Sequence, residues 1–337
     1  MAYTTIDNPE LYFQVKLYTG NGSTQTITLD NTDADLDPDL IWVKKRSGSH
    51  DSVVVDTVRG VTKVIETSTT DAEATWANGI TAISTDSFAV GDAGATNDNT
   101  ETFVAWCWKE SADAGFDIVT YTGNGNTSRT ISHSLSAVPH VMTIKERASG
   151  TSGWITYHHK NTSAPETDYL MLNTNSATDD YADYWDDTAP TSSVFTVDNA
   201  ADINGNTDTY VAYLWAEKQG FSKFNSYIGN SNANGAFIYL GFRPAFIMIK
   251  RTNGTQWWIM KDNKRDGVGG GNPNKYLLYP NASDAEETNS NAMDFLSNGF
   301  KFRESTSGGN NSGGTYIYMA FAEAPFVNSN GVPCNAR

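Results

Sequence analysis

The stretch FVAWCW, residues 103–108, is apolar at every position. In a β-strand, successive side chains alternate between two faces, so one face of this strand would carry Phe, Ala and Cys and the other Val, Trp and Trp. A strand that is apolar on both faces is covered on both faces, and we expect this one to lie deep inside a β-structure. The stretch recurs as YVAYLW at 210–215 and as YIYMAF at 316–321.

Two further landmarks recur in the same order. The first is YTGNG, found at residues 18–22 and 121–125 and, as YIGNS, at 227–231. The second is PDLIWVKKR at 38–46, matched by PHVMTIKER at 139–147 and PAFIMIKR at 244–251. Corresponding landmarks are separated by 101 to 107 positions. The chain therefore contains three copies of one module.

Each module, at roughly 100 residues, can hold a core of its own, unlike a solenoid unit of about 20–50 residues. Its apolar runs are short, rich in β-branched and aromatic residues, and separated by turn signals such as Asn-Gly. We predict an all-β protein of three tandem β-sandwich (jelly-roll-like) modules. Their predicted bounds are 15–110, 116–218 and 223–326, with an N-terminal arm at 1–14 and a C-terminal tail at 327–337.

Local signals add two expectations about the chain's path. Asn-Gly at 21–22 and 124–125 predicts tight hairpin turns, because such turns need positive φ at both central residues. The arm is expected to pack on the first module, and docking elsewhere is the alternative.

Charge and composition exclude several classes of protein. The 337 residues carry 23 Lys and Arg against 39 Asp and Glu, a net charge of −16, which argues against nucleic-acid binding. No apolar run reaches 18 residues, so we expect no membrane span, and no signal-peptide pattern opens the chain. Two cysteines cannot form a disulfide scaffold for a chain of this length.

Motifs for catalysis are missing from the sequence. It has no Gly-x-Ser-x-Gly elbow and no P-loop, and its five histidines do not have the spacing of a metal site. We predict no enzymatic activity, no cofactor and no metal. The acidic segments 30–39 (Asp33, Asp35, Asp37 and Asp39) and 179–187 are interpreted as solvated loops, with calcium binding left open. The segment 202–208 is interpreted as a turn.

Four segments, within residues 1–22 and at 241–251, 294–303 and 315–326, resemble repeated modules in virion proteins of marine tailed bacteriophages. This resemblance covers nearly the whole chain and carries no catalytic motif. It implies a virion structural protein, made in the host cytoplasm and placed on the tail or the head surface, with other virion proteins as partners. We expect a tail fibre that attaches to the host. A capsid decoration (cement) protein is the alternative, and a carbohydrate-active enzyme is a remote one.

The many aromatic residues, nine Trp, sixteen Tyr and fifteen Phe, predict self-association as a homotrimer, because small modules do not readily bury so much aromatic surface.

The third module differs from the others in charge. Residues 1–110, 111–222 and 223–337 have net charges of −10, −9 and +3. We place a partner or glycan contact on this module, at Trp257, Trp258, Lys261, Lys264 and Arg265, beside the loop 267–272. The adjacent Trp side chains should point to opposite faces, so at most one lies in the core. Lys264 and Arg265 are expected to be exposed. A basic, aromatic surface suits an anionic cell-surface polysaccharide or an acidic neighbouring virion protein.

Overall fold

The computed structural model describes residues 3–29, 36–265, 271–288, 291–305 and 308–334. The all-β prediction is confirmed. Within the described residues, helix is limited to a 3-10 turn, η1 (Pro9–Leu11), and the four-residue helices α1 (Gly94–Asn97), α2 (Ala182–Trp185) and α3 (Ala201–Asn204). No described helix is long and apolar enough to cross a membrane.

Each module contains one large antiparallel sheet with the same order of its first four strands. In module 1 these strands are β1 (Phe13–Thr19), β9 (Thr102–Trp108), β3 (Leu40–Lys45) and β4 (Val53–Asp56), extended by β5 (Lys63–Glu66) and β6 (Ala74–Thr75). In module 2 they are β10 (Phe116–Thr122), β17 (Thr209–Trp215), β12 (Val141–Glu146) and β13 (Trp154–His158), extended by β14 (Asp168–Met171) and β15 (Asp179–Asp180). In module 3 they are β18 (Ser222–Ile228), β24 (Thr315–Pro325), β20 (Phe242–Arg251) and β21 (Ile259–Asp262).

A small sheet accompanies each large one. The small sheets are β2 (Gln25–Thr28), β8 (Ser87–Val90) and β7 (Ile80–Ser84) in module 1, β11 (Arg129–Ser132) and β16 (Val194–Val197) in module 2, and β19 (Phe237–Tyr239), β23 (Gly299–Phe302) and β22 (Met293–Leu296) in module 3. In module 1, Ile27 and Phe88 of the small sheet share a core with Ile41 and Ala105 of the large one. In module 2, Ile131 and Phe195 of the small sheet likewise share a core with Ile144 and Ala212 of the large one, and module 3 has the same pair of sheets. This is the arrangement of a sandwich, and the strand limits lie close to the predicted bounds.

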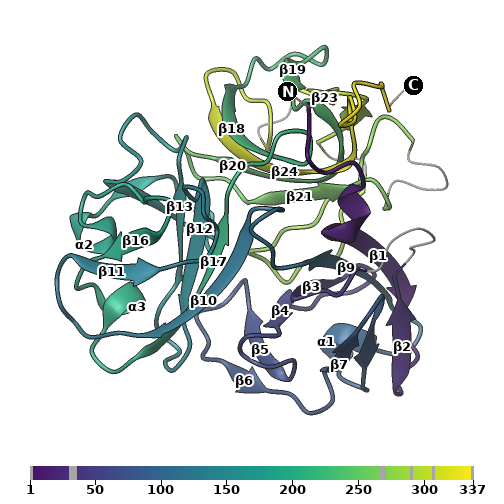
Figure 1. Ribbon diagram of the computed structural model, residues 1–337. Helices are drawn as coiled ribbons and strands as arrows, with labels where there is room; N and C mark the ends of the chain where they lie inside the picture. The colour runs from purple at the N-terminus through teal and green to yellow at the C-terminus, as the bar shows by residue number, and fades with distance from the viewer. Residues whose placement is uncertain (1–2, 30–35, 266–270, 289–290, 306–307, 335–337) are drawn as a thin grey trace.

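The all-apolar strand is covered on both faces, as its sequence predicts. On β9, Phe103 and Cys107 enter the core of module 1, whereas Trp106 and Trp108 enter a second core that all three modules share. Figure 1 shows the modules as three lobes around this centre, coloured purple to blue, teal, and green to yellow.

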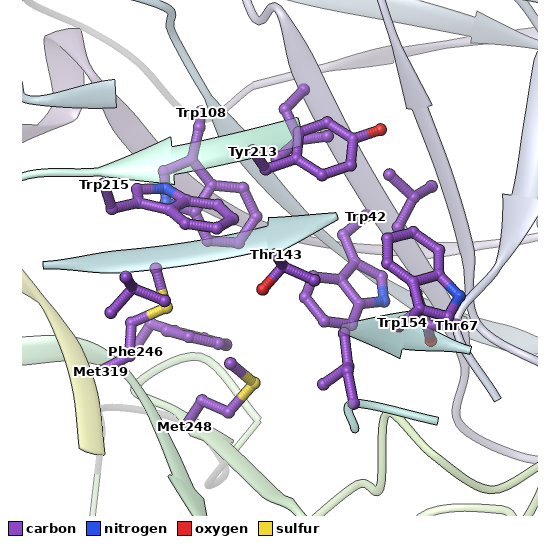
Figure 2. Close-up of a pocket in the computed structure, with 14 residues that line it drawn as sticks. Trp42, Thr67, Trp108, Thr143, Trp154, Tyr213, Trp215, Phe246, Met248 and Met319 are labelled. Carbon is purple, nitrogen blue, oxygen red and sulfur yellow. The ribbon is translucent and has the colours of Figure 1, made fainter. Parts of the chain in front are cut away.

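Large side chains from every module meet in this shared core. They include Trp42, Trp106 and Trp108 of module 1, Trp154, Tyr213 and Trp215 of module 2, and Phe246, Met248, Met319 and Phe321 of module 3. Figure 2 shows most of them converging. The aromatic content from which a homotrimer was expected is thus largely buried within a single chain, and self-association stays a prediction.

Three buried lysines tie the modules into a closed ring. Lys44, Lys145 and Lys250 occupy the same position in the three modules and are fully buried. Each Nζ donates to a backbone carbonyl of a neighbouring module. Lys44 donates to Ala282 at 2.7 Å, Lys145 to Thr70 at 3.2 Å, and Lys250 to Asn175 at 3.2 Å. Module 1 thus contacts module 3, module 2 contacts module 1, and module 3 contacts module 2.

An ionic network completes the junction between modules 2 and 1. Tyr213 of module 2 donates its hydroxyl to Asp56 of module 1 at 2.7 Å, and Arg59 donates Nε to the same carboxylate at 2.5 Å. Arg59 also reaches Glu73 at 3.0 Å, and Arg147 of module 2 pairs with Glu73 at 2.8 Å. These groups satisfy one another's charges away from water, which a buried ionic cluster requires.

The junction between modules 1 and 3 repeats this network at equivalent positions. Trp106 donates Nε1 to Asp262 at 3.1 Å, Arg265 binds Asp262 at 2.6 Å and Glu286 at 3.0 Å, and Arg46 binds Glu286 at 2.8 Å.

At the third junction, between modules 3 and 2, every one of these positions has changed. Met319 stands at the position of the Trp or Tyr donor, and His158 stands at the position of the Asp acceptor. In module 2, Asn161 stands at the position of Arg59 and Thr178 at that of Glu73. In module 3, Thr252 stands at the position of Arg147. The backbone bond from the Thr178 N–H to the Thr252 carbonyl, 2.9 Å, is kept. A hydrogen bond from the Thr178 hydroxyl to Asn161 Oδ1, 2.6 Å, stands where Arg59 pairs with Glu73. Neither the donor nor the acceptor is present at this junction, so no buried charge is left without a partner.

The repeated YTGNG segment is a crossover between two sheets, so the predicted hairpin is wrong. Gly22 has the expected positive φ of 63°, but β1 pairs with β9 whereas β2 pairs with β8. The loop is held by the buried Asn97, whose Oδ1 accepts from the Asn21 N–H at 3.0 Å. A Cβ at Gly20 would lie 2.1 Å from the Asp98 carbonyl oxygen, so only glycine fits there. Asn204 and Asn310 hold the corresponding loops of modules 2 and 3.

The start of the N-terminal arm docks on module 3 and the C-terminal tail, which was the alternative, whereas its end packs on module 1 as expected, with the Tyr12 carbonyl accepting from the Lys109 N–H at 3.0 Å. Tyr3 donates its hydroxyl to the Gly241 carbonyl at 2.8 Å, and Asp7 accepts from the Ser329 N–H at 2.7 Å. Ile6 is buried in the shared core, and this burial explains the docking. The first segment of the chain thus closes onto the last module.

Replacing Asp56 tests the contribution of the ionic junctions. Asp56→Ala should lower the free energy of unfolding by about 3–5 kcal/mol, because it leaves the Arg59 guanidinium buried without its nearest carboxylate. Urea unfolding followed by tryptophan fluorescence measures the change. The control is Asp113→Ala, at an exposed carboxylate, which should change stability by less than about 0.5 kcal/mol. Equal effects of the two substitutions would contradict the role of the network.

The buried lysines predict a pH dependence of stability. Burial lowers the pKa of Lys44 and Lys145 to about 8 and that of Lys250 to about 7. In the unfolded chain the lysine pKa is about 10.4. At pH values between the folded and the unfolded pKa, the unfolded chain therefore binds more protons than the folded chain, and the free energy of unfolding rises with pH. Replacing Lys250 with Met should reduce the gain in stability between pH 7 and 9 by on the order of 1 kcal/mol.

The exposed Lys264 provides the control for this measurement. Lys264→Met should leave the difference in unfolding free energy between pH 7 and 9 as in the wild type. A Lys250→Met protein with the wild-type pH dependence would show that Lys250 titrates normally.

Candidate binding surface

Three of the five residues predicted to contact a partner are buried, so this part of the prediction is wrong. Trp258, Lys261 and Arg265 have exposed fractions of only 3, 1 and 2 %. Trp258 donates Nε1 to the Met171 carbonyl of module 2 at 3.0 Å. Lys261 donates to the Tyr276 carbonyl at 3.1 Å, and Arg265 belongs to the ionic network between modules 1 and 3. Their polar groups serve internal bonds, which a sequence pattern does not distinguish from surface charge.

The other two predicted residues are on the surface. Trp257 is 38 % exposed and packs beside Tyr279, with ring centroids 6.0 Å apart. The expectation that the two adjacent Trp side chains separate is confirmed, because Trp257 is outside and Trp258 inside. Lys264 is exposed, and residues 267–270 of the predicted loop lie outside the described residues.

Module 3 carries an exposed aromatic pair that is not among the predicted contact residues. Phe237 and Tyr239, on β19, are 46 % and 48 % exposed. Between them, Ile238 is buried. Both rings therefore project from the outer face of the small sheet, whereas Ile238 points into the core.

Modules 1 and 2 carry small hydroxyl side chains at these two outward positions. The segment TIT at 26–28 and the segment TIS at 130–132 each place a buried isoleucine between two exposed residues, as FIY does at 237–239. The strand thus forms with Thr or Ser at these positions in two modules. The aromatic pair of module 3 is therefore not needed for the fold. Aligning these three segments would have found the pair from the sequence.

Basic side chains lie beside the exposed rings. Lys223 of β18 places Nζ 5.5 Å from the centroid of the Tyr239 ring, within the range of a cation–π contact. Lys301 of β23 is directly opposite Phe237. The Tyr3 hydroxyl lies 3.3 Å from that of Tyr239, and partial burial together with this hydrogen bond raises the pKa of Tyr3. We call Phe237, Tyr239, Lys223 and Lys301 the module 3 patch.

A small cavity, of about 20 Å³, lies where the modules meet (Figure 2). Its lining is almost entirely apolar, and its one ionisable member, Tyr213, donates its hydroxyl to Asp56. The indole N–H groups of Trp42, Trp108 and Trp215 are buried there without a described partner. With neither a nucleophile beside a base nor a pair of carboxylates in its lining, the cavity offers no arrangement for general acid–base or nucleophilic catalysis.

The described residues bring together no group of three or more His, Cys, Asp or Glu side chains that could hold a metal ion. In the first acidic segment, Asp37 is exposed, Asp39 accepts from Thr57 and from the Glu110 N–H, and Asp33 and Asp35 lie outside the described residues. In the second, Asp179 and Asp180 form the exposed strand β15.

Three histidines cluster between modules 2 and 3, which their spacing in the sequence does not indicate. The rings of His140 and His159 are 4.4 Å apart, and those of His158 and His159 are 5.5 Å apart. Burial lowers the pKa of His158 to about 3 and that of His159 to about 4, so both are neutral at pH 7. His158 and His159 each place Nε2 near a module 3 carbonyl oxygen, at Tyr318 and Phe224. Their role is in the junction.

Comparison with known proteins gives a family and no function. No curated protein matches the chain. The model of a family described as a domain of unknown function (DUF7483) matches residues 8–325, from the N-terminal arm to the end of β24. The match spans all three modules, so the family unit is the whole ring and not the single module. The chain belongs to the DUF7483 family.

Proposed function

We propose that this protein is a bacteriophage virion structural protein that attaches the particle to its host, as a tail fibre or receptor-binding protein without catalytic activity. The observation that carries the proposal is the module 3 patch. It places two exposed aromatic rings beside two lysines on one module, and the rings stand at positions where the other two modules have Thr or Ser. The resemblance of four segments to virion proteins of marine tailed phages supports the same assignment.

The ring suits this role mechanically. Its modules share a core and bond in a closed cycle, so the patch is carried on a rigid support. Binding groups on a rigid scaffold lose little conformational freedom when a partner is bound, which favours recognition. The difference between module 3 and the others also gives the ring a single recognition face of this kind.

Immunogold labelling of intact phage particles with antibodies to this protein tests the proposal. Label at the distal end of the tail is expected, and the purified protein should compete with particles for adsorption to host cells. Label on the capsid without competition would identify a decoration protein instead. Particles without label would overturn the virion assignment altogether.

A further inference from the structure

We propose that the module 3 patch binds an acidic polysaccharide, with the rings of Phe237 and Tyr239 stacking on sugar rings and Lys223 and Lys301 attracting their carboxylates. This inference deepens the proposed attachment function and rests on it. It replaces the predicted site around Trp257 and Arg265 with a different face of the same module.

Phe237 and Tyr239 present their rings on one face of β19, and we call this face the platform. Alternate residues of a strand are about 7 Å apart and project from the same face, so Phe237 and Tyr239 stand side by side on β19. Gly299 of β23 pairs with Tyr239, and a Cβ at Gly299 would lie 3.0 Å from Cε2 of Phe237. The absence of a side chain at Gly299 therefore leaves room for the Phe237 ring to lie across β23.

The chemistry of the platform fits a carbohydrate. The face of an aromatic ring packs against the C–H groups of a sugar, and neighbouring rings at this spacing can engage successive sugars of a chain. A Tyr ring also offers a hydroxyl at its edge for hydrogen bonding to sugar hydroxyls.

The charge around the platform selects an acidic sugar. Lys223 lies against the Tyr239 ring and Lys301 opposite Phe237, and in the described part of the chain neither lysine forms an ion pair. Asp294 faces Lys301 across β22 and β23, but its carboxylate is paired with Arg303. The patch therefore keeps a positive charge, on the one module whose net charge is positive.

The test compares two variants of the full chain. Phe237→Thr combined with Tyr239→Thr gives module 3 the side chains that module 1 has at 26 and 28, so the fold should be kept. Trp257→Thr, which removes an exposed aromatic side chain of module 3 outside the patch, is the control. Binding of each protein to alginate, a polyuronate, and to the neutral polysaccharide dextran is measured by affinity electrophoresis and titration calorimetry.

The wild type should bind alginate in preference to dextran, and more weakly as salt rises. The double variant should bind alginate about tenfold more weakly or worse, and the control should bind like the wild type. Wild-type affinity in the double variant, or equal binding of dextran and alginate, would overturn the inference. The inference would also be overturned if the wild type bound no alginate and the patch were needed for incorporation into particles. In that case the patch would contact a protein.

Competition with phage adsorption separates this inference from the proposed function. If the wild type and the double variant both compete, attachment stands and the location of the site is wrong. If neither competes while alginate binding still depends on Phe237 and Tyr239, the patch binds acidic glycans but attachment to the host is wrong.

Discussion

Burial of aromatic side chains between the modules is the interaction on which the rest of the structure depends. Trp106, Tyr213 and Met319 occupy one position of the three central strands, and each points away from its own module into the shared core. A sandwich module built this way has a large apolar face that it cannot cover alone. Burying that face favours the ring by about 25 cal/mol for each Å² of apolar surface removed from water, which makes the three modules one structural unit.

Polar groups then fix how the modules are oriented. The lysines at 44, 145 and 250 each donate to the neighbouring module, so every junction has the same direction around the ring. A head-to-tail contact of this kind either closes or extends into a filament, and here three modules close it. Module 1 carries the donor Trp106 of one ionic junction and the acceptor Asp56 of the other, whereas module 2 supplies only a donor and module 3 only an acceptor.

Comparison of equivalent positions in the three modules separates the structural residues from the candidates for function. Charged and aromatic residues that recur at equivalent positions, such as Arg59 and Arg265, have their partners inside the ring. Phe237 and Tyr239, in contrast, depart from the repeat and are exposed. The departure at Met319 and His158 is instead compensated within the third junction, and it therefore indicates packing and not recognition.

The three-module organisation and the doubly covered strand 103–108 could be predicted from the sequence, because both follow from periodicity and spacing. The closed ring could not, because no local pattern shows that Lys44 reaches Ala282, 238 residues away. Arg265 was predicted to be exposed because its pairing with Asp262, three residues earlier, does not by itself show that both groups are buried between modules. The predicted hairpin at Asn21-Gly22 is wrong because these residues lie in a crossover between two sheets, which Asn97 holds by a hydrogen bond.

Calorimetry of the intact chain tests the central claim, that three modules with one shared core form a single cooperative unit. A single cooperative unit should show one unfolding transition whose calorimetric enthalpy equals its van't Hoff enthalpy. Two or three separate transitions, with a calorimetric enthalpy well above the van't Hoff value, would show that the modules fold independently and would contradict the account.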